Sequence, residues 1–334
     1  YAVETRDIGS TIEYKRFDDY WDGQRPNNFG RLLQQFIGQP ATMQSMLAAG
    51  DANQSDPWLP NTIYDTLRSE SKVTINEDAD PQFVYWIKLN NQNEFLKNVH
   101  IRRALSYALN YESVVKKIFG PSHQRVVGPI PQTFQPWFNP DITIYNYDMA
   151  KAQEEFDLSG FKPGEVKLKF VADAGLTPRT ETGLLLAEAA KKIGIEIEVE
   201  EVPTNRIVEM YKTPETAADM LPHVPGSVYA DPDSFLYIGY HSSTWKAGGT
   251  PSTSFLDDSE VDRLLISGRT ATSSDKRMSI YHDIQKKLTD QANDIWIMQQ
   301  TVTTALSSNI EGWNYIPFHF FNFTLRVNNL YKAE

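Results

Sequence analysis

The chain has 334 residues, of which 40% are hydrophobic, and a formal net charge of -11 at pH 7. This length allows two domains or one large domain. The absence of cysteine excludes disulfides, thiolate metal sites and cysteine nucleophiles. The acidic balance argues against nucleic acid and anionic membrane surfaces as partners, because both attract a basic face. Apolar stretches are short and interrupted, so no transmembrane helix is predicted.

The first 97 residues predict a mixture of strand and helix. Residues 11–16 alternate in the way that a half-buried strand does. Residues 42–49 have a helical pattern, and the apolar run at residues 83–89 suits a buried strand.

A second segment, residues 98–302, opens with an amphipathic helix pair. Asn98 is a favourable N-cap for the first helix. The helical pattern breaks at Asn110, resumes, and stops at Gly120 and the proline after it. An α/β core follows, with a strand, a helix and a strand predicted at residues 166–171, 181–193 and 195–199.

The remainder of the chain predicts two helices and two strands. The first helix begins near Ser259, and the second covers residues 275–292. The strands cover residues 296–304 and 318–325. The two strands would return the chain to its first part. We therefore expect one unit of residues 1–97 with 303–334, and another of residues 98–302.

Enzyme motifs are absent from the sequence. It contains no P-loop, GxGxxG, GxSxG or HExxH pattern. The histidines do not fall at metal-ligand spacings, so no metal or cofactor site is predicted. Two carboxylate clusters are the candidates for the catalytic groups of a carbohydrate-active hydrolase. The first is Asp231 with Asp233, and the second is Asp257 with Asp258 and Glu260. Turn formation is the favoured interpretation of the first cluster, and capping of the helix that starts near Glu260 is the favoured interpretation of the second.

Seven segments carry a family resemblance, in addition to their individual patterns. They are FDDYW (17–21), MLAAGD (46–51), residues 97–140 with RRALSYALN and GPIP, YDMAKA (147–152), residues 179–185 with KIGI (192–195), DPDSF (231–235) with YHS (240–242), and SEVDRLL (259–265). In residue identities and in order along the chain, they resemble the family 5 extracytoplasmic solute-binding proteins. These are the peptide, nickel and oligosaccharide receptors of ABC importers. Met149 departs from the pattern, because the family usually has proline there.

The resemblance implies a fold and a function. The implied fold is α/β and two-lobed, and it is periplasmic-binding-protein-like. It belongs to class II, in the large form that has an extra domain, and the amino-terminal part is expected to be missing here. Residues 1–97 and 303–334 would be a partial lobe one, and residues 98–302 lobe two. The implied protein is a periplasmic or cell-surface receptor, monomeric and non-catalytic, that closes over a peptide-like or oligosaccharide-like solute and delivers it to the membrane permease of an ABC importer.

The resemblance also implies where a solute would bind. Lobe two would contribute the loop at residues 221–230 and the loop at residues 173–179, and more weakly the GPIPQTFQPWF loop at residues 128–138. The candidate ligand-binding residues are Asp173, Arg179, Gly226, Val228, Tyr229, Asp231, Phe134, Trp137 and Trp245. Two of these interpretations stay open. Arg179 can pair with a ligand carboxylate or with the lobe surface, and the aromatic side chains at 134 and 137 can stack on a ligand or hold their own loop.

The solute class is predicted from one position at which this sequence departs from the family pattern. Peptide receptors of the family typically carry an aspartate that pairs with the peptide ammonium group, and Val228 aligns with that position. Valine cannot pair with an ammonium group, and burying that charge without a partner costs several kcal/mol. Asp231 is a possible substitute from three residues along. We therefore expect a solute without an essential free amino terminus, such as an oligosaccharide.

Two alternatives to a receptor are a hydrolase that uses the carboxylate groups and an interaction module that has lost ligand binding. A receptor is stabilised by its ligand without turnover, whereas a hydrolase releases product.

Overall fold

The computed structural model describes residues 1–21, 23, 28–55, 59–224, 229–315 and 330–332. The chain forms two compact units, residues 1–79 with 301–334 and residues 80–300. Two long strands pass from one unit into the other, β4 (Val73–Leu89) and β9 (Asp294–Ser307). The predicted strand at residues 318–325 lies outside the described residues.

The first unit contains a small antiparallel sheet and two helices. Its elements are β1 (Ala2–Asp7), β2 (Thr11–Lys15), β3 (Arg31–Gln35), α1 (Pro40–Ala49), α2 (Asn61–Leu67), β10 (Ile310–Glu311) and β11 (Tyr331–Lys332). β2 lies between β1 and β3. Leu47, Tyr64, Leu67 and Ala305 form a small buried cluster. The predicted strand at 11–16 and helix at 42–49 are confirmed as β2 and α1.

The second unit is larger and contains the α/β core. Its elements are α3 (Val99–Ala108), the π-helix η1 (Ser113–Ile118), β5 (Gln124–Arg125), α4 (Met149–Leu158), β6 (Lys167–Asp173), α5 (Thr177–Lys192), β7 (Glu196–Val202), α6 (Thr204–Met210), β8 (Met220–His223), α7 (Pro232–Tyr240), α8 (Ser242–Lys246), α9 (Ser259–Thr270) and α10 (Ser274–Asp290). The strand order of the sheet is β5-β9-β4-β8-β6-β7. β6 is parallel to β7 and β8, and β4 is antiparallel to β8.

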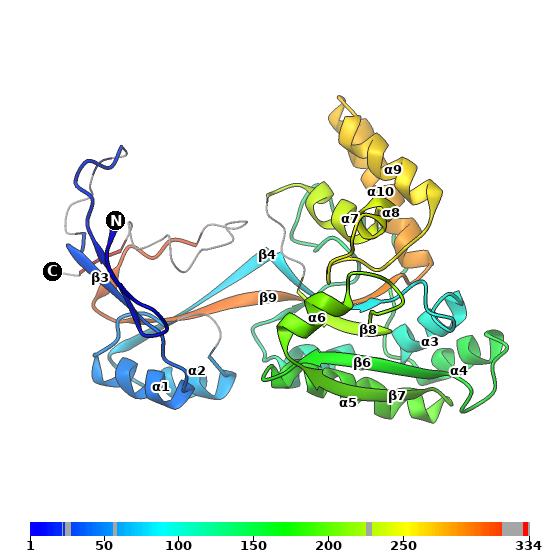
Figure 1. The fold of residues 1–334 in the computed structure, drawn as a ribbon, viewed down its shortest axis with the longest axis horizontal. Helices are drawn as coiled ribbons and strands as arrows, with labels where there is room; N and C mark the ends of the chain where they lie inside the picture. The colour runs from blue at the N-terminus through cyan, green and yellow to red at the C-terminus, as the bar shows by residue number, and fades with distance from the viewer. Residues whose placement is uncertain (22, 24–27, 56–58, 225–228, 316–329, 333–334) are drawn as a thin grey trace. The chain divides into compact units, whose positions relative to one another are not determined.

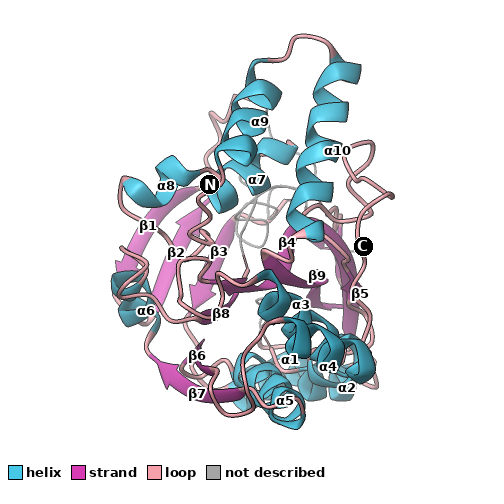
Figure 2. Ribbon diagram, turned by 90° about the vertical axis from the view of Figure 1, so that its right-hand side faces the viewer, coloured by secondary structure: helices cyan, strands magenta, loops and turns pink. Residues whose placement is uncertain are grey.

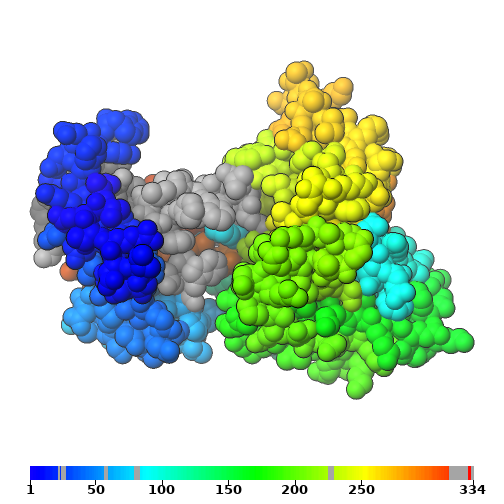
Figure 3. Space-filling model, viewed as in Figure 1, coloured from blue at the N-terminus to red at the C-terminus, as the bar shows by residue number. Residues whose placement is uncertain are grey.

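Helices cover both faces of this sheet. On one face α3, α4 and α5 pack against β4 and β6 in the main core, while α6 lies on the other face with α7 (Figure 1). α9 and α10 form a hairpin that projects from the rest of the unit, as the turned view and the space-filling view show (Figures 2 and 3).

Local sequence signals explain several of the helix ends. The Asn98 side chain accepts a hydrogen bond from the backbone N–H of His100 and so caps α3. Gly50 ends α1 in the left-handed conformation, at a φ of 91°. The predicted helix at 275–292 is α10, and the predicted helix at 181–193 is α5, which begins four residues earlier.

The boundary between the units differs from the one expected. We placed residues 80–97 with the first unit and 301–302 with the second, whereas the structure divides the chain after residue 79 and after residue 300. The reason is hydrophobic burial. Tyr85, Ile87 and Leu89 of β4 are fully buried in the same core as Ile101 and Leu105 of α3, so the end of this strand belongs to the second unit.

Candidate functional site

The carboxyl ends of β6 and β8 lie at one edge of the second unit's sheet, because the two strands are parallel neighbours. β6 ends at Asp173 and β8 ends at His223. Ligands of open α/β sheets usually bind outside the carboxyl ends of the strands. We call residues 173–179, 220–224 and 229–233 the β6–β8 edge.

Asp173 and Arg179 form an ion pair at this edge. Nη1 of Arg179 donates to Oδ2 of Asp173, and Oγ1 of Thr204 donates to its Oδ1 at 2.9 Å. Only 7% of the Asp173 side chain and 18% of the Arg179 side chain is exposed. One donor of the guanidinium is therefore bound to a carboxylate of the same unit, in a pair that is more buried than a solvent-screened surface pair.

His223 was not singled out from the sequence, although it lies in a loop named there. Its Nε2 is 3.2 Å from Oγ of Ser252. Burial, together with the smaller effect of the positive charges of Arg179 and Lys88, lowers the pKa of His223 to about 3. The imidazole is therefore neutral near pH 7.

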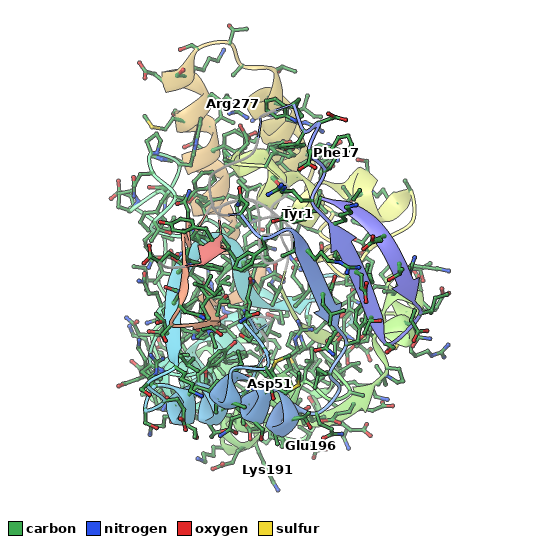
Figure 4. All side chains as sticks on the ribbon, turned by 90° about the vertical axis from the view of Figure 1, so that its left-hand side faces the viewer. Tyr1, Phe17, Asp51, Lys191, Glu196 and Arg277 are labelled. Carbon is green, nitrogen blue, oxygen red and sulfur yellow. The ribbon has the colours of Figure 1, made fainter. Side chains whose placement is uncertain are left out.

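Asp231 holds the start of α7 to α10. Its Oδ1 accepts the backbone N–H of Asp233 at 2.9 Å and so caps α7. Arg277 of α10 binds both carboxylate oxygens, at 2.8 and 2.7 Å. The guanidinium also lies 5.1 Å from the ring of Trp137. Figure 4 labels Arg277 on this helix. Asp231 therefore caps α7, a helix that was not predicted from the sequence, where only a turn was expected.

Asp233 makes a second set of contacts, which join α7 to α9 and to the loop before α7. Tyr229 donates its hydroxyl to Oδ2 of Asp233 at 2.9 Å, and Nε of Arg269 lies 3.4 Å from Oδ1. Arg269 also stacks over the ring of Tyr237, at 4.0 Å. Tyr229 keeps 46% of its surface exposed, so its ring remains accessible at the edge.

The other aromatic candidates hold loops in place. Phe134 is buried and packs edge-on against Phe235, with ring centroids 6.2 Å apart. Trp137 packs edge-on against Tyr281 at 6.0 Å. Nε1 of Trp245 donates to the backbone carbonyl of Leu256 at 2.9 Å. Gly226 and Val228 lie outside the described residues.

The second carboxylate group is also engaged. Oδ1 of Asp258 accepts the backbone N–H groups of Glu260 and Val261 and caps α9. Asp257 pairs with Lys246 at 2.8 Å, and Glu260 pairs with Lys287 at 2.6 Å.

Within the part of the chain that the structure describes, no group of three or more acidic or histidine side chains is placed to hold a metal ion. Among the same residues, no helix combines the length and hydropathy needed to span a bilayer.

A buried ion pair behind the edge was also missed from the sequence. Nζ of Lys88 lies 2.8 Å from Oδ2 of Asp294, and Tyr240 donates its hydroxyl to the same oxygen at 2.6 Å. The ammonium group lies between the rings of Trp86 and Tyr240, at 4.5 and 4.6 Å. These contacts join β4, β9 and α7. The signal in the sequence is a lone lysine in the apolar run of residues 83–89.

Comparison with known proteins identifies the family. The model of the family described as "Bacterial extracellular solute-binding proteins, family 5 Middle" matches residues 1–247. The chain belongs to this family.

Family 5 relatives match most of this chain. The probable D,D-dipeptide-binding periplasmic protein DdpA of Escherichia coli is 26% identical over 299 residues, which are 89% of this chain and 56% of that protein. The oligopeptide-binding protein AppA of Bacillus subtilis is 26% identical over 324 residues, 92% of this chain and 57% of that protein. The chain therefore spans a little over half the length of these curated relatives.

Solved structures establish the family 5 fold for this chain. The ABC transporter substrate-binding protein CtaP of Listeria monocytogenes superposes with a TM-score of 0.84 at 20% sequence identity, covering 99% of this chain and 66% of that one. The predicted α/β, periplasmic-binding-protein-like fold is confirmed. The family assignment made from the seven sequence segments is confirmed as well.

Proposed function

We propose that this chain belongs to an extracytoplasmic receptor that binds a solute and delivers it to the membrane permease of an ABC importer, without catalysis. The observation that carries the proposal is the family 5 match over residues 1–247. The two relatives described above are named for binding a D,D-dipeptide and an oligopeptide. Peptide-like solutes therefore belong in any ligand panel, together with oligosaccharides.

In this proposal residues 80–300 are lobe two, and the β6–β8 edge is its solute-facing part. The receptor acts as a monomer in the periplasm or at the cell surface and has no nucleic acid partner. The exposed ring of Tyr229 provides flat contact area at the edge. The engagement of the carboxylates in caps and ion pairs supports binding rather than hydrolysis, because neither group offers two free carboxyls.

Ligand binding tests the proposal. The full-length gene product is screened by thermal shift against di- to pentapeptides and oligosaccharides, and hits are measured by calorimetry and by product analysis. We expect at least one solute to raise the Tm and to be recovered unchanged. Release of product would support the hydrolase instead, and a panel without any stabilising solute would support an interaction module.

Two matched tyrosine variants locate the binding surface. Tyr229 and Tyr147 are similarly exposed, at 46% and 48%, but Tyr147 precedes α4 and is not part of the β6–β8 edge. We expect Tyr229→Ala to weaken solute binding at least tenfold and Tyr147→Ala to leave it within twofold. Equal effects of the two substitutions would place the solute elsewhere.

A further inference from the structure

We propose that the β6–β8 edge selects an uncharged polar solute, one held by hydrogen bonds and ring stacking rather than by an ion pair. This inference rests on the receptor function proposed above and specifies its ligand. Its basis is that the charged side chains of the described edge are each matched by a partner within the second unit.

The first matched pair is Asp173 with Arg179. The carboxylate receives hydrogen bonds from Arg179 and from Thr204, and both charged side chains are largely buried. A solute carboxylate would meet a guanidinium whose charge Asp173 already compensates, and it would gain a full ion pair only by displacing Asp173; a solute ammonium group would likewise have to displace Arg179. Either exchange leaves a buried charge without its partner, which is strongly unfavourable.

The second and third matched charges lie at the start of α7. Both oxygens of Asp231 bind Arg277. The Asp233 carboxylate, which is 8% exposed, faces Arg269 at 3.4 Å and accepts the hydroxyl of Tyr229. A ligand cation at this position would meet carboxylates that are already neutralised by arginine.

His223 completes the edge without adding a charge. Its imidazole is held next to Ser252, and its burial, followed by its cationic neighbours Arg179 and Lys88, opposes protonation. Lys88 is itself bound to Asp294. A charged group on the solute would therefore lose hydration at this edge without gaining an opposite charge, at a cost that an uncharged solute avoids.

The remaining groups of the edge suit a hydroxyl-rich or amide solute. The neutral imidazole can both donate and accept a hydrogen bond. The exposed ring of Tyr229 can stack on the apolar face of a sugar or on a peptide plane. A few convergent polar groups beside an aromatic surface are typical of sites for small polar ligands.

One cation close to the edge provides a control. Arg206 of α6 is exposed and has no ion pair among the described residues, and it lies two residues beyond Thr204. If a solute anion were bound here through a free cation, Arg206 would be the side chain to bind it. We expect Arg206→Gln to leave affinity within twofold.

Calorimetry on the full-length gene product tests the ligand class with three probes, each built from three units. These are maltotriose, trialanine, and trialanine blocked by amino-terminal acetylation and carboxy-terminal amidation. We expect an uncharged probe to bind at least tenfold more tightly than free trialanine, with an affinity that changes less than twofold between 20 mM and 500 mM NaCl, since screening acts only on charge interactions.

Unpairing the buried charges gives the sharper test. Arg179→Gln removes the partner of Asp173, and we expect the affinity ratio of free to blocked trialanine to shift at least fivefold toward the free, ammonium-bearing peptide. Asp173→Asn frees the guanidinium, and we expect a fivefold shift of the same ratio toward free trialanine, which also bears a carboxylate. The double variant should return the ratio to its original value. If one single variant does not fold, the other still tests the idea.

The outcomes separate this inference from the receptor proposal. Tightest binding of free trialanine, lost on blocking or in 500 mM NaCl, would overturn the inference and leave the receptor intact. The same holds if Arg179→Gln abolishes binding of a carboxylate-bearing probe that the unmodified protein prefers. Absence of binding by all three probes and by the wider peptide and sugar panel would overturn both.

Discussion

Arg277 belongs to no motif in the sequence, yet it connects more of the candidate site than any residue predicted there. Its guanidinium binds both oxygens of Asp231, donates from Nε to the Gly268 carbonyl at 2.9 Å, and lies over the ring of Trp137. The hydrogen bonds to Asp231 raise the pKa of Arg277 above its ordinary value. Loop 128–138, the start of α7, α9 and α10 are thus held by one side chain.

Replacing Arg277 tests how much its contacts contribute to the stability of the fold. We expect Arg277→Gln to lower the free energy of unfolding by about 2–3 kcal/mol, because it leaves the partly buried Asp231 without its bidentate partner. Urea unfolding followed by circular dichroism measures the change. Arg263→Gln, an exposed substitution on α9, is the control and should cost less than about 0.5 kcal/mol. Equal losses would mean that the pair contributes little.

His223 gives the protein a defined pH dependence. Its folded pKa of about 3 lies below the ordinary value of 6.5, so the unfolded chain binds more protons between these values. Stability is then fully present above pH 6.5 and falls as the pH drops toward 3, by up to about 1.4 kcal/mol per pH unit. We expect His223→Gln to flatten the profile between pH 7 and pH 5 in urea titrations. A profile as steep as that of the unmodified protein would contradict this assignment.

At the scale of elements, the second unit depends on the close packing of α5 against β6. Gly183 is buried in the middle of α5, where a glycine is normally unfavourable. A Cβ at this position would lie 2.5 Å from Cδ1 and Cε1 of Phe170. The absence of a side chain therefore allows the helix to approach the strand that leads to Asp173.

This packing predicts an unusual response to alanine. Gly183→Ala gains helix propensity, but we expect a net loss of about 1–3 kcal/mol, because the Phe170 ring must move in a filled core. Thermal unfolding followed by circular dichroism measures it. Gly38→Ala is the matched control, since no atom lies within 4 Å of its added Cβ, and it should be neutral or slightly stabilising. Stabilisation by the Gly183 substitution would show that Phe170 relaxes freely.

At the scale of the whole molecule, the two units differ in how much they bury. The main core of the second unit draws on the sheet, α3, α4 and α5, whereas the cluster around Leu47 in the described part of the first unit has four buried residues. Every side chain of β1 is exposed, and Val3, Leu33 and Phe36 are apolar side chains exposed in or beside the small sheet.

Hydrogen exchange should report this difference. We expect the backbone amides of β1, β2 and β3 to exchange faster than those of β6 and α5, because few buried apolar contacts oppose their opening. Exchange followed by mass spectrometry on the intact chain resolves the segments. Equal protection of β2 and β6 would contradict the expectation, and α1, which contributes Leu47 to the buried cluster, provides an intermediate reference.

The sequence by itself determined the family and the fold class, and its local patterns predicted part of the helices and strands, among them α1, α3, β6, α5 and α10. Asn98 caps α3, Gly50 ends α1, and the Asp231 and Asp258 side chains cap α7 and α9, as short-range rules predict. Tertiary structure alone decided the unit boundary within β4, since burial of Tyr85 depends on α3 and the rest of the core. Tertiary structure also decided which charged side chains pair with one another. The ion pairs of Asp231 with Arg277 and Lys88 with Asp294 join residues 46 and 206 positions apart, and no local pattern encodes such a separation.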